Sequence, residues 1–102
     1  MDDRTPEEEI ADFLKKDGAI EIILVIDKKA GTIHSNFKDY LHISRATVTK
    51  RLEKAESLGL IEQSRQPEDH GNAKRYVLTE EGRMLRVAVE SMGLPEKYQQ
   101  YI

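Results

Sequence analysis

The chain has 102 residues, enough for one domain with one modest core, and contains no cysteine, which excludes disulfides, thiolate metal sites and a cysteine nucleophile. Its longest apolar run, Ile22 to Ile26, is too short to cross a bilayer, and its acidic N-terminus argues against a signal peptide, so we expect a cytoplasmic protein that does not bind membranes. The net charge is −3, but residues 31–79 carry +2 between flanks of −4 and −1, which predicts one modestly basic face.

The first predicted element is a helix over residues 5–16, which Asp17-Gly18 ends. Thr5 suits its N-cap, Pro6 its first helical position and Glu8 the reciprocal position of a capping box. Residues 19–29 are ambiguous, because their β-branched side chains favour a strand whereas the length of the run favours a helix. We predict a buried helix that ends before Gly31.

A short strand and a second short helix are predicted next. Residues 32–34 suit a small strand, Ser35 suits the N-cap of a helix over residues 36–41, and His42-Ile43 forms a tight turn. The side chains of this helix that we expect to face inward are Phe37, Tyr40 and Leu41. With the stretch that follows, these residues predict a helix-turn-helix.

The stretch from Ser44 to Leu58 has the pattern of an amphipathic helix. Val48, Leu52 and Ala55 recur at spacings of four and three and share one face, while Gly59 ends the helix. The remaining surface is small, hydroxylic and cationic, a mixture that suits the DNA major groove. Its members, with the cap, are Ser44, Arg45, Ala46, Thr47, Thr49, Lys50 and Lys54. The alternative is an ordinary solvated helix face.

Two strands around a polar loop follow this helix. Residues 60–65 alternate loosely, residues 67–72 are dense in turn formers and residues 74–78 form a second strand. A hairpin directly after a helix-turn-helix is a wing, which lies on phosphates or in the minor groove. The candidate DNA contacts within the wing, residues 61–78, are Arg65, His70, Asn72, Lys74 and Arg75. The alternative is a solvated hairpin, because two acidic residues dilute its charge.

A last helix is predicted over residues 80–92, capped by Thr79 and stopped by Gly93-Leu94-Pro95. It either covers the core or, together with the helix over residues 5–16, forms a dimer surface. We predict a homodimer, because dimers read two half-sites. The apolar stripe of this helix consists of Met84, Leu85, Ala88, Val89 and Met92.

Two segments resemble parts of known transcriptional regulators. ISRATVTKRLEKAESLGLIEQ (Ile43–Gln63) resembles the recognition helix and first wing strand of the prokaryotic and archaeal MarR, HxlR and PadR-like groups. KRYVLTEEGRML (Lys74–Leu85) resembles their second wing strand and the helix after it. The two matches lie in the right order and cover about residues 19–85.

The resemblance implies an α+β, mostly helical fold: a winged helix-turn-helix with a short hairpin wing and flanking N- and C-terminal helices. It also implies a dimeric DNA-binding repressor or activator. Base contacts would come from Arg45, Thr47, Thr49 and Lys50, and wing contacts from near His70 to Lys74. Many MarR-type wings carry an arginine at the tip, but the loop PEDHGN has none, so His70 or Lys74 would replace it.

We therefore predict a sequence-specific transcriptional regulator that binds double-stranded DNA. It forms a single domain over residues 1–102, with a winged-helix core over 19–79 and terminal helices 5–16 and 80–92 for dimerisation. The acidic flanks keep one alternative, a winged-helix module that binds proteins in a larger complex. We predict no enzymatic activity, since the sequence shows no catalytic motif and no glycine-rich phosphate loop. We expect no metal and no cofactor, because the three histidines lack ligand spacing, and no small-molecule effector is indicated.

Overall fold

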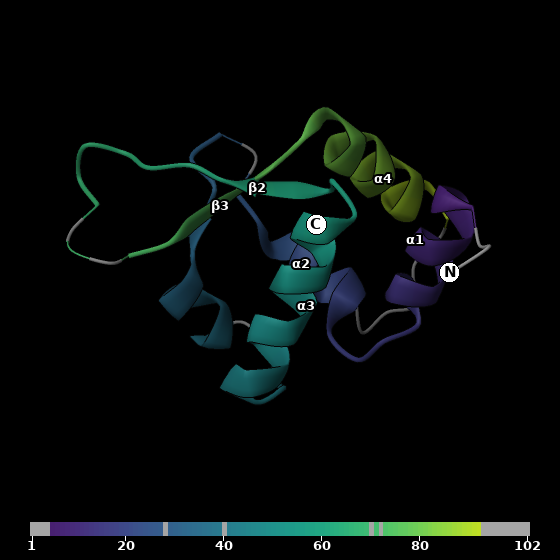
Figure 1. Ribbon diagram of the computed structural model, residues 1–102, viewed down its shortest axis with the longest axis horizontal. Helices are drawn as coiled ribbons and strands as arrows, with labels where there is room; N and C mark the ends of the chain where they lie inside the picture. Colours follow the sequence, from purple (N-terminus) through teal and green to yellow (C-terminus); the bar gives the residue numbers. More distant parts are fainter. Residues whose placement is uncertain (1–4, 28, 40, 70, 72, 93–102) are drawn as a thin grey trace.

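A computed structural model describes residues 5–27, 29–39, 41–69, 71 and 73–92, and Figure 1 shows their arrangement. The described part is mostly helical, with a small sheet from which a hairpin projects, so the predicted winged helix-turn-helix fold is confirmed. The elements in chain order are α1 (Pro6–Leu14), α2 (Ala19–Val25), β1 (Thr32–Ile33), the 3₁₀ helix η1 (His34–Asp39), α3 (Arg45–Ser57), β2 (Ile61–Gln63), β3 (Arg75–Leu78) and α4 (Glu80–Ser91).

The described strands form one antiparallel sheet in the order β1-β3-β2. Thr32 pairs with Tyr76 on one side of the central strand, and Ile61 pairs with Leu78 on the other. Beyond these short ladders the chain between β2 and β3 extends away from the helices, as Figure 1 shows. The sheet therefore anchors the hairpin at its base and leaves its loop projecting.

One hydrophobic core joins the helices to the sheet. Each fully buried Ile, Leu or Phe contributes about 1.5–3 kcal/mol relative to an exposed one. Phe37 of η1 packs edge-on against Tyr76 of β3, with ring centroids 6.4 Å apart. The buried apolar side chains include Phe13, Ala19, Ile22, Ile23, Ile26, Phe37, Leu41, Val48, Leu52, Ala55, Leu60, Ile61, Tyr76 and Leu78. Helices α1, α2, η1 and α3 and strands β2 and β3 all have side chains in this core, and Leu85 of α4 packs against it. The shared core sets the position of α3 relative to the hairpin.

The predicted helix over residues 19–29 is wrong at its end, because α2 stops at Val25. Ile26 is already extended, with ψ of 124°, and the carboxylate of Asp27 accepts hydrogen bonds from the backbone N–H groups of Lys29 at 2.9 Å and Ala30 at 2.7 Å. The Asp27 N–H donates to the Thr32 hydroxyl at 3.1 Å. An aspartate that satisfies a turn in this way competes successfully with the helix.

The second short helix also differs from its prediction over residues 36–41. It is a 3₁₀ helix that begins at His34, not after a cap at Ser35. The His34 N–H donates to the Lys74 carbonyl at 2.7 Å, so η1 starts directly at the edge of the sheet. Phe37 and Leu41 are buried as expected, whereas Tyr40 lies outside the described residues.

The predicted apolar stripe of α4 is divided between two faces. Leu85 and Val89 lie on the core side, together with Gly82 and Arg86, whereas Ala88 is exposed. The largest exposed apolar side chains on the described part of the chain are Met84, Val87 and Met92, with exposed fractions of 67%, 63% and 77%. The predicted N-caps of α1 and α4 are confirmed, because Thr5 and Thr79 accept from the backbone N–H groups of Glu8 and Gly82.

The guanidinium of Arg86 lies at the C-terminal end of α2. It donates to the carbonyls of Ile26 at 2.7 Å and Ile23 at 3.4 Å, and it forms an ion pair with Glu90 at 2.9 Å. The last carbonyls of a helix have no partner within the helix. Arg86 supplies that partner from another element, and it therefore joins α4 to the end of α2.

Candidate nucleic-acid interface

Helix α3 is held firmly at both ends. The Ser44 hydroxyl accepts from the Thr47 N–H at 3.1 Å and donates to the Thr47 hydroxyl at 2.9 Å. At the other end Gly59 adopts a φ of 77°, and the chain turns so that the Leu60 N–H donates to the Ala55 carbonyl at 3.0 Å. The prediction of a helix capped by Ser44 and ended by Gly59 is confirmed.

The inward face of α3 determines which of its side chains reach solvent. Val48, Leu52 and Ala55 are buried, so the opposite face points away from the core. On that side the exposed predicted residues are Ser44, Arg45, Ala46, Lys50 and Lys54, while Thr47 and Thr49 are half-buried. Since Ser44 already uses its hydroxyl as the cap, Arg45, Ala46 and Lys50 form the most accessible part of the predicted surface.

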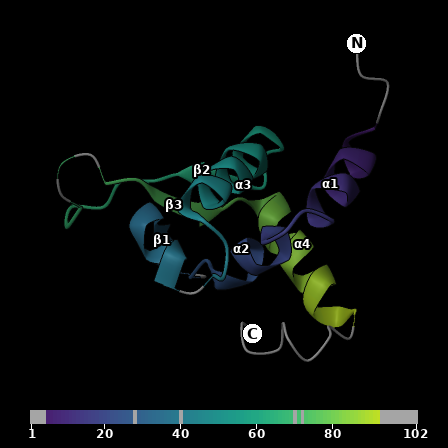
Figure 2. The same ribbon diagram turned by 90° about the horizontal axis from the view of Figure 1, so that it is seen from below.

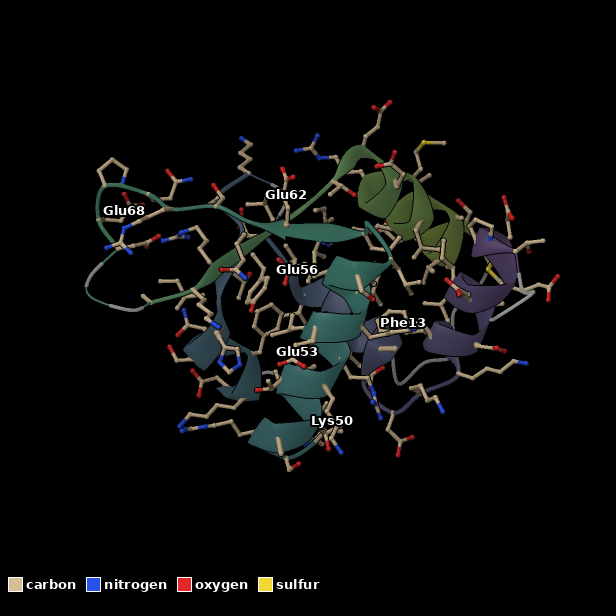
Figure 3. The ribbon with its side chains drawn as sticks, viewed as in Figure 1. Phe13, Lys50, Glu53, Glu56, Glu62 and Glu68 are labelled. Carbon is tan, nitrogen blue, oxygen red and sulfur yellow. The ribbon has the colours of Figure 1, made fainter. Side chains whose placement is uncertain are left out.

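Two carboxylates on α3 were not among the predicted site residues. Glu53 is exposed and lies about one turn after Lys50, and Glu56 accepts from the Gln63 amide nitrogen at 3.3 Å. Figure 3 shows Lys50, Glu53 and Glu56 at successive levels of the helix. The first half of α3 is therefore cationic, and its second half carries both charges. The sequence signal for the two carboxylates is their position on a helical wheel of residues 44–58.

His34 connects η1 to α3. Its Nε2 atom lies 2.9 Å from the Thr49 hydroxyl, and its ring is 6.4 Å from that of Tyr76. Burial lowers the pKa of His34 below its ordinary value, and the charges of Lys74 and Arg45 lower it further. Both effects favour the neutral form of the imidazole. His34 was not predicted as a site residue, because its contact with Thr49 depends on the tertiary fold.

A cleft separates α3 from the sheet beside this histidine. Its volume is about 460 Å³, and its walls combine cationic, anionic and hydroxyl groups. The polar side chains that line it are His34, Ser35, Thr49, Glu53, Glu56, Gln63, Lys74 and Tyr76. The predicted wing residue Lys74 and the predicted helix residue Thr49 thus lie on one surface.

The hairpin is organised around a buried carboxylate. Asp69 accepts from Arg75 at 2.6 and 3.1 Å and from the Gln66 N–H at 2.9 Å. These hydrogen bonds, first the one from Arg75, lower the pKa of Asp69 to about 2. Arg75 also donates to the Ala30 carbonyl at 3.0 Å. The structure thus places Arg75, a predicted DNA contact, in the interior of the hairpin base.

The other predicted wing residues lie nearer solvent or outside the description. Arg65 donates to the Gly71 carbonyl at 3.1 Å, which stabilises the loop, and its side chain remains exposed to solvent. Lys74 is exposed next to the buried Arg75. His70 and Asn72 lie outside the described residues.

A helix-turn-helix followed by a hairpin, with a cationic exposed helix start, defines a winged helix-turn-helix protein. The sequence matches the model of the HxlR-like helix-turn-helix family over residues 20–100. The chain therefore belongs to the HxlR-like helix-turn-helix family. None of the curated proteins compared with the sequence matches it.

Several solved structures share this fold. A possible HxlR-family transcription factor from Thermoplasma volcanium is 22% identical, with a TM-score of 0.67 over 87% of this chain and 79% of that one. A MarR-family transcriptional regulator from Porphyromonas gingivalis is 18% identical, with a TM-score of 0.69 over 90% and 89%. FabT from Streptococcus pneumoniae, solved in complex with DNA, is 27% identical, with a TM-score of 0.58 over 78% and 62%.

Proposed function

We propose that this protein is a sequence-specific regulator that inserts α3 into the major groove and lays its hairpin along the flanking backbone. The observation that carries the proposal is the exposed start of α3, where Arg45, Ala46 and Lys50 project from a helix fixed to the core by its opposite face. The complex of FabT with DNA shows that a protein of this fold binds DNA. A rigid helix with accessible cationic and small side chains is what base reading requires.

The residues of α3 have different parts in this proposal. Arg45 and Lys50 are long and exposed, so they reach guanine edges or phosphates, and Ala46 allows close approach. Thr47 and Thr49 are half-buried and offer hydroxyl or methyl contacts at short range. Lys54 lies further along the helix and serves as a phosphate contact. Each good base contact is worth about 1–3 kcal/mol of discrimination against the wrong base.

The hairpin contributes positive charge without an arginine at its tip. Lys74 and Arg65 are its exposed cations within the described residues, and His70 and Asn72 remain sequence-based candidates for the tip. Arg75 is left out of the proposed contacts, because its guanidinium is occupied by Asp69 and Ala30. Wing contacts of this kind position the protein on the backbone and add affinity that falls with salt.

We assign dimerisation to the terminal helices, residues 5–16 and 80–92, which flank the winged-helix core over 19–79. The exposed apolar side of α4, formed by Met84, Val87, Ala88 and Met92, would be covered by a second copy of the chain. A Val87→Glu variant should sediment as a monomer; an unchanged sedimentation coefficient would contradict this assignment. Dimerisation would present two copies of α3 to two half-sites.

This proposal includes a cytoplasmic location and no enzymatic activity. No helix in the described part of the chain is long and apolar enough to cross a membrane. The family and the similar structures are transcriptional regulators. The partners included in this proposal are double-stranded DNA and a second copy of the chain, with no small-molecule effector.

The decisive experiment is an anisotropy titration against the duplex upstream of the protein's own gene, with unrelated duplex as competitor. Arg45→Ala/Lys50→Ala should abolish specific binding while the fold survives, because two base or phosphate contacts are lost. The matched control is Lys29→Ala/Arg83→Ala, which removes the same charge from exposed positions outside α3 and the hairpin. Because Arg83 lies on α4 beside the proposed dimer surface, the control must sediment as wild type does. Equal affinity of the two double variants would refute the assignment of α3.

A second candidate function rests on the carboxylates beside the cationic surface. Glu53, Glu62 and Glu68 are exposed from α3, β2 and the hairpin loop, and Figure 3 shows Glu62 above β2, Glu53 on α3 below it and Glu68 on the loop. With a net charge of −3, these exposed carboxylates suit a basic protein partner in a larger complex. That function predicts a tight protein complex and no DNA binding beyond the roughly 10⁻⁴ to 10⁻⁶ M of non-specific contacts.

A further inference from the structure

A second group of cations lies on the side of α3 that faces away from the hairpin. There α1 and α3 enclose a cleft of about 550 Å³. Both ribbon views place α3 between the hairpin and α1 (Figures 1 and 2). The side chains that line the cleft are Glu9, Asp12, Phe13, Lys15, Lys16, Arg51 and Lys54.

The two walls of the cleft are fixed relative to each other by a hydrogen bond and by buried packing. The Arg51 Nε donates to the Asp17 carbonyl at 2.7 Å, which ties α3 to the connection between α1 and α2. Phe13 is buried beneath the cleft, and Figure 3 shows it between α3 and α1. The positions of Lys15 and Lys16, directly after α1, are therefore fixed relative to α3.

The cleft has more positive than negative side chains, four against two, so its local charge is +2. Lys15 pairs with Asp12 only at 4.0 Å, with 78% of the Lys15 side chain exposed. Such an exposed pair is weak and readily exchanged for another anion. Lys16 and Lys54 are exposed as well. A cluster of cations held together in this manner suits a polyanionic ligand.

The geometry of the duplex indicates which polyanion. The major groove is about 12 Å wide and has a phosphate backbone on each side, and a helix with its side chains is about 10–12 Å thick. A helix in the groove therefore lies between two backbones. The hairpin cations Arg65 and Lys74 face one of them.

We propose that Lys15, Lys16, Arg51 and Lys54 bind the phosphates of the second backbone, so that the footprint extends onto the connection after α1. This inference rests on the proposed insertion of α3. It assigns new DNA contacts to Lys15 and Lys16, which lie outside the helix-turn-helix and the wing, and to Arg51 on α3 beside them. Electrostatically the protein then holds both edges of the groove.

The test is Lys15→Gln/Lys16→Gln, measured by anisotropy between 50 and 200 mM salt beside wild type, Arg45→Ala/Lys50→Ala and Lys29→Ala/Arg83→Ala. Loss of two phosphate contacts should reduce the slope of log K against log salt by about 1.8. The affinity deficit of the variant should then be about tenfold larger at 50 mM than at 200 mM salt. Both lysines are exposed, so the variant should retain the wild-type melting temperature.

The outcomes separate this inference from the proposed function. A reduced slope in Lys15→Gln/Lys16→Gln, with an unchanged slope in the Lys29→Ala/Arg83→Ala control, supports the second backbone contact. If Lys15→Gln/Lys16→Gln has the same slope as the control, the second backbone contact is overturned. The proposed function of α3 still holds in that case, provided that Arg45→Ala/Lys50→Ala loses specific binding. If wild type forms no specific complex, the proposed function fails and this inference fails with it.

Discussion

Replacement of Arg86 by methionine tests how far α2 depends on α4. The substitution keeps a long apolar stem but removes the donors from the carbonyls of Ile26 and Ile23 and from Glu90. The bond to Ile26, at 2.7 Å, is charge-assisted and worth about 1.5–3 kcal/mol. The longer bond to Ile23 and the partly exposed ion pair add about 1 kcal/mol together. We expect a total loss of about 3 kcal/mol.

A loss of this size is large for a domain of this kind. Small domains are stable by about 5–15 kcal/mol, and 1 kcal/mol lowers the melting temperature of a 100-residue domain by roughly 4–8 °C. Arg86→Met should therefore lower the melting temperature by about 12–24 °C, measured by circular dichroism with urea unfolding beside it. The melting temperature of Arg86→Lys should lie between those of wild type and Arg86→Met, because a single ammonium reaches fewer acceptors than a guanidinium.

Arg83→Met is the matched control, since Arg83 lies on the same helix but is exposed. Surface substitutions of this type change stability by about 0.5 kcal/mol or less. If Arg86→Met costs less than about 1 kcal/mol, water satisfies the carbonyls of α2 equally well. The connection between the two helices would then lie in apolar packing alone.

Three further predictions concern the contact of α4 with Leu60, the hairpin, and the contact of η1 with α3. Gly82→Ala should lose about 1–3 kcal/mol of stability despite the helix propensity of alanine, because the added Cβ would overlap the Leu60 carbonyl oxygen; an unchanged melting temperature would contradict this. The pKa of Asp69 is lowered from 3.8 to about 2, so the unfolded state takes up its proton first as pH falls. As pH falls from 3.8 to about 2, the free energy of unfolding should decrease in wild type and decrease less in Asp69→Asn. Parallel curves of unfolding free energy against pH would refute the role of Asp69. Burial also lowers the pKa of His34 below 6.5, so stability should fall as pH drops below 6.5, and His34→Gln should reduce this fall; identical pH profiles would count against it.

The sequence predicted the position of α3 closely because its determinants are local. The cap at Ser44, the spacing of Val48, Leu52 and Ala55, and the stop at Gly59 all lie within one stretch of chain. Each acts through neighbours in the helix or its first turn beyond. The same holds for Thr5 and Thr79, whose capping bonds reach three residues ahead.

The errors arose where a hydrogen bond that does not belong to the helical pattern decides the local conformation. The helix over residues 19–29 ends early because the Thr32 hydroxyl and the Asp27 carboxylate satisfy backbone groups that a longer helix would have used. In the same way η1 begins at His34 because the Lys74 carbonyl, on another strand, accepts its N–H. Propensity and periodicity describe neither contact.

The arginines show why a candidate site read from residue types alone is incomplete. Arg45, Arg75 and Arg86 are chemically identical, yet Arg45 is exposed on α3 while the other two are buried with carboxylate and carbonyl acceptors around them. What separates them is whether the fold places an acceptor within reach, since a guanidinium is buried only when its donors are satisfied. An arginine that is buried with such partners stabilises the scaffold, whereas one that is exposed, or that uses only some of its donors within the fold as Arg51 and Arg65 do, has donors left for phosphates and bases.

This distinction also explains how a chain with a net charge of −3 can bind DNA. Two of its arginines carry charge that is compensated inside the fold, and many of its carboxylates lie on α1 and the start of α4. Most of the exposed cations in the described part of the chain lie on α3 and on its two flanks, the hairpin and the connection after α1, whereas Lys29, Lys38 and Arg83 are exposed elsewhere. Affinity then depends on how many phosphates these accessible cations reach, so its dependence on salt measures the footprint more directly than the overall charge does.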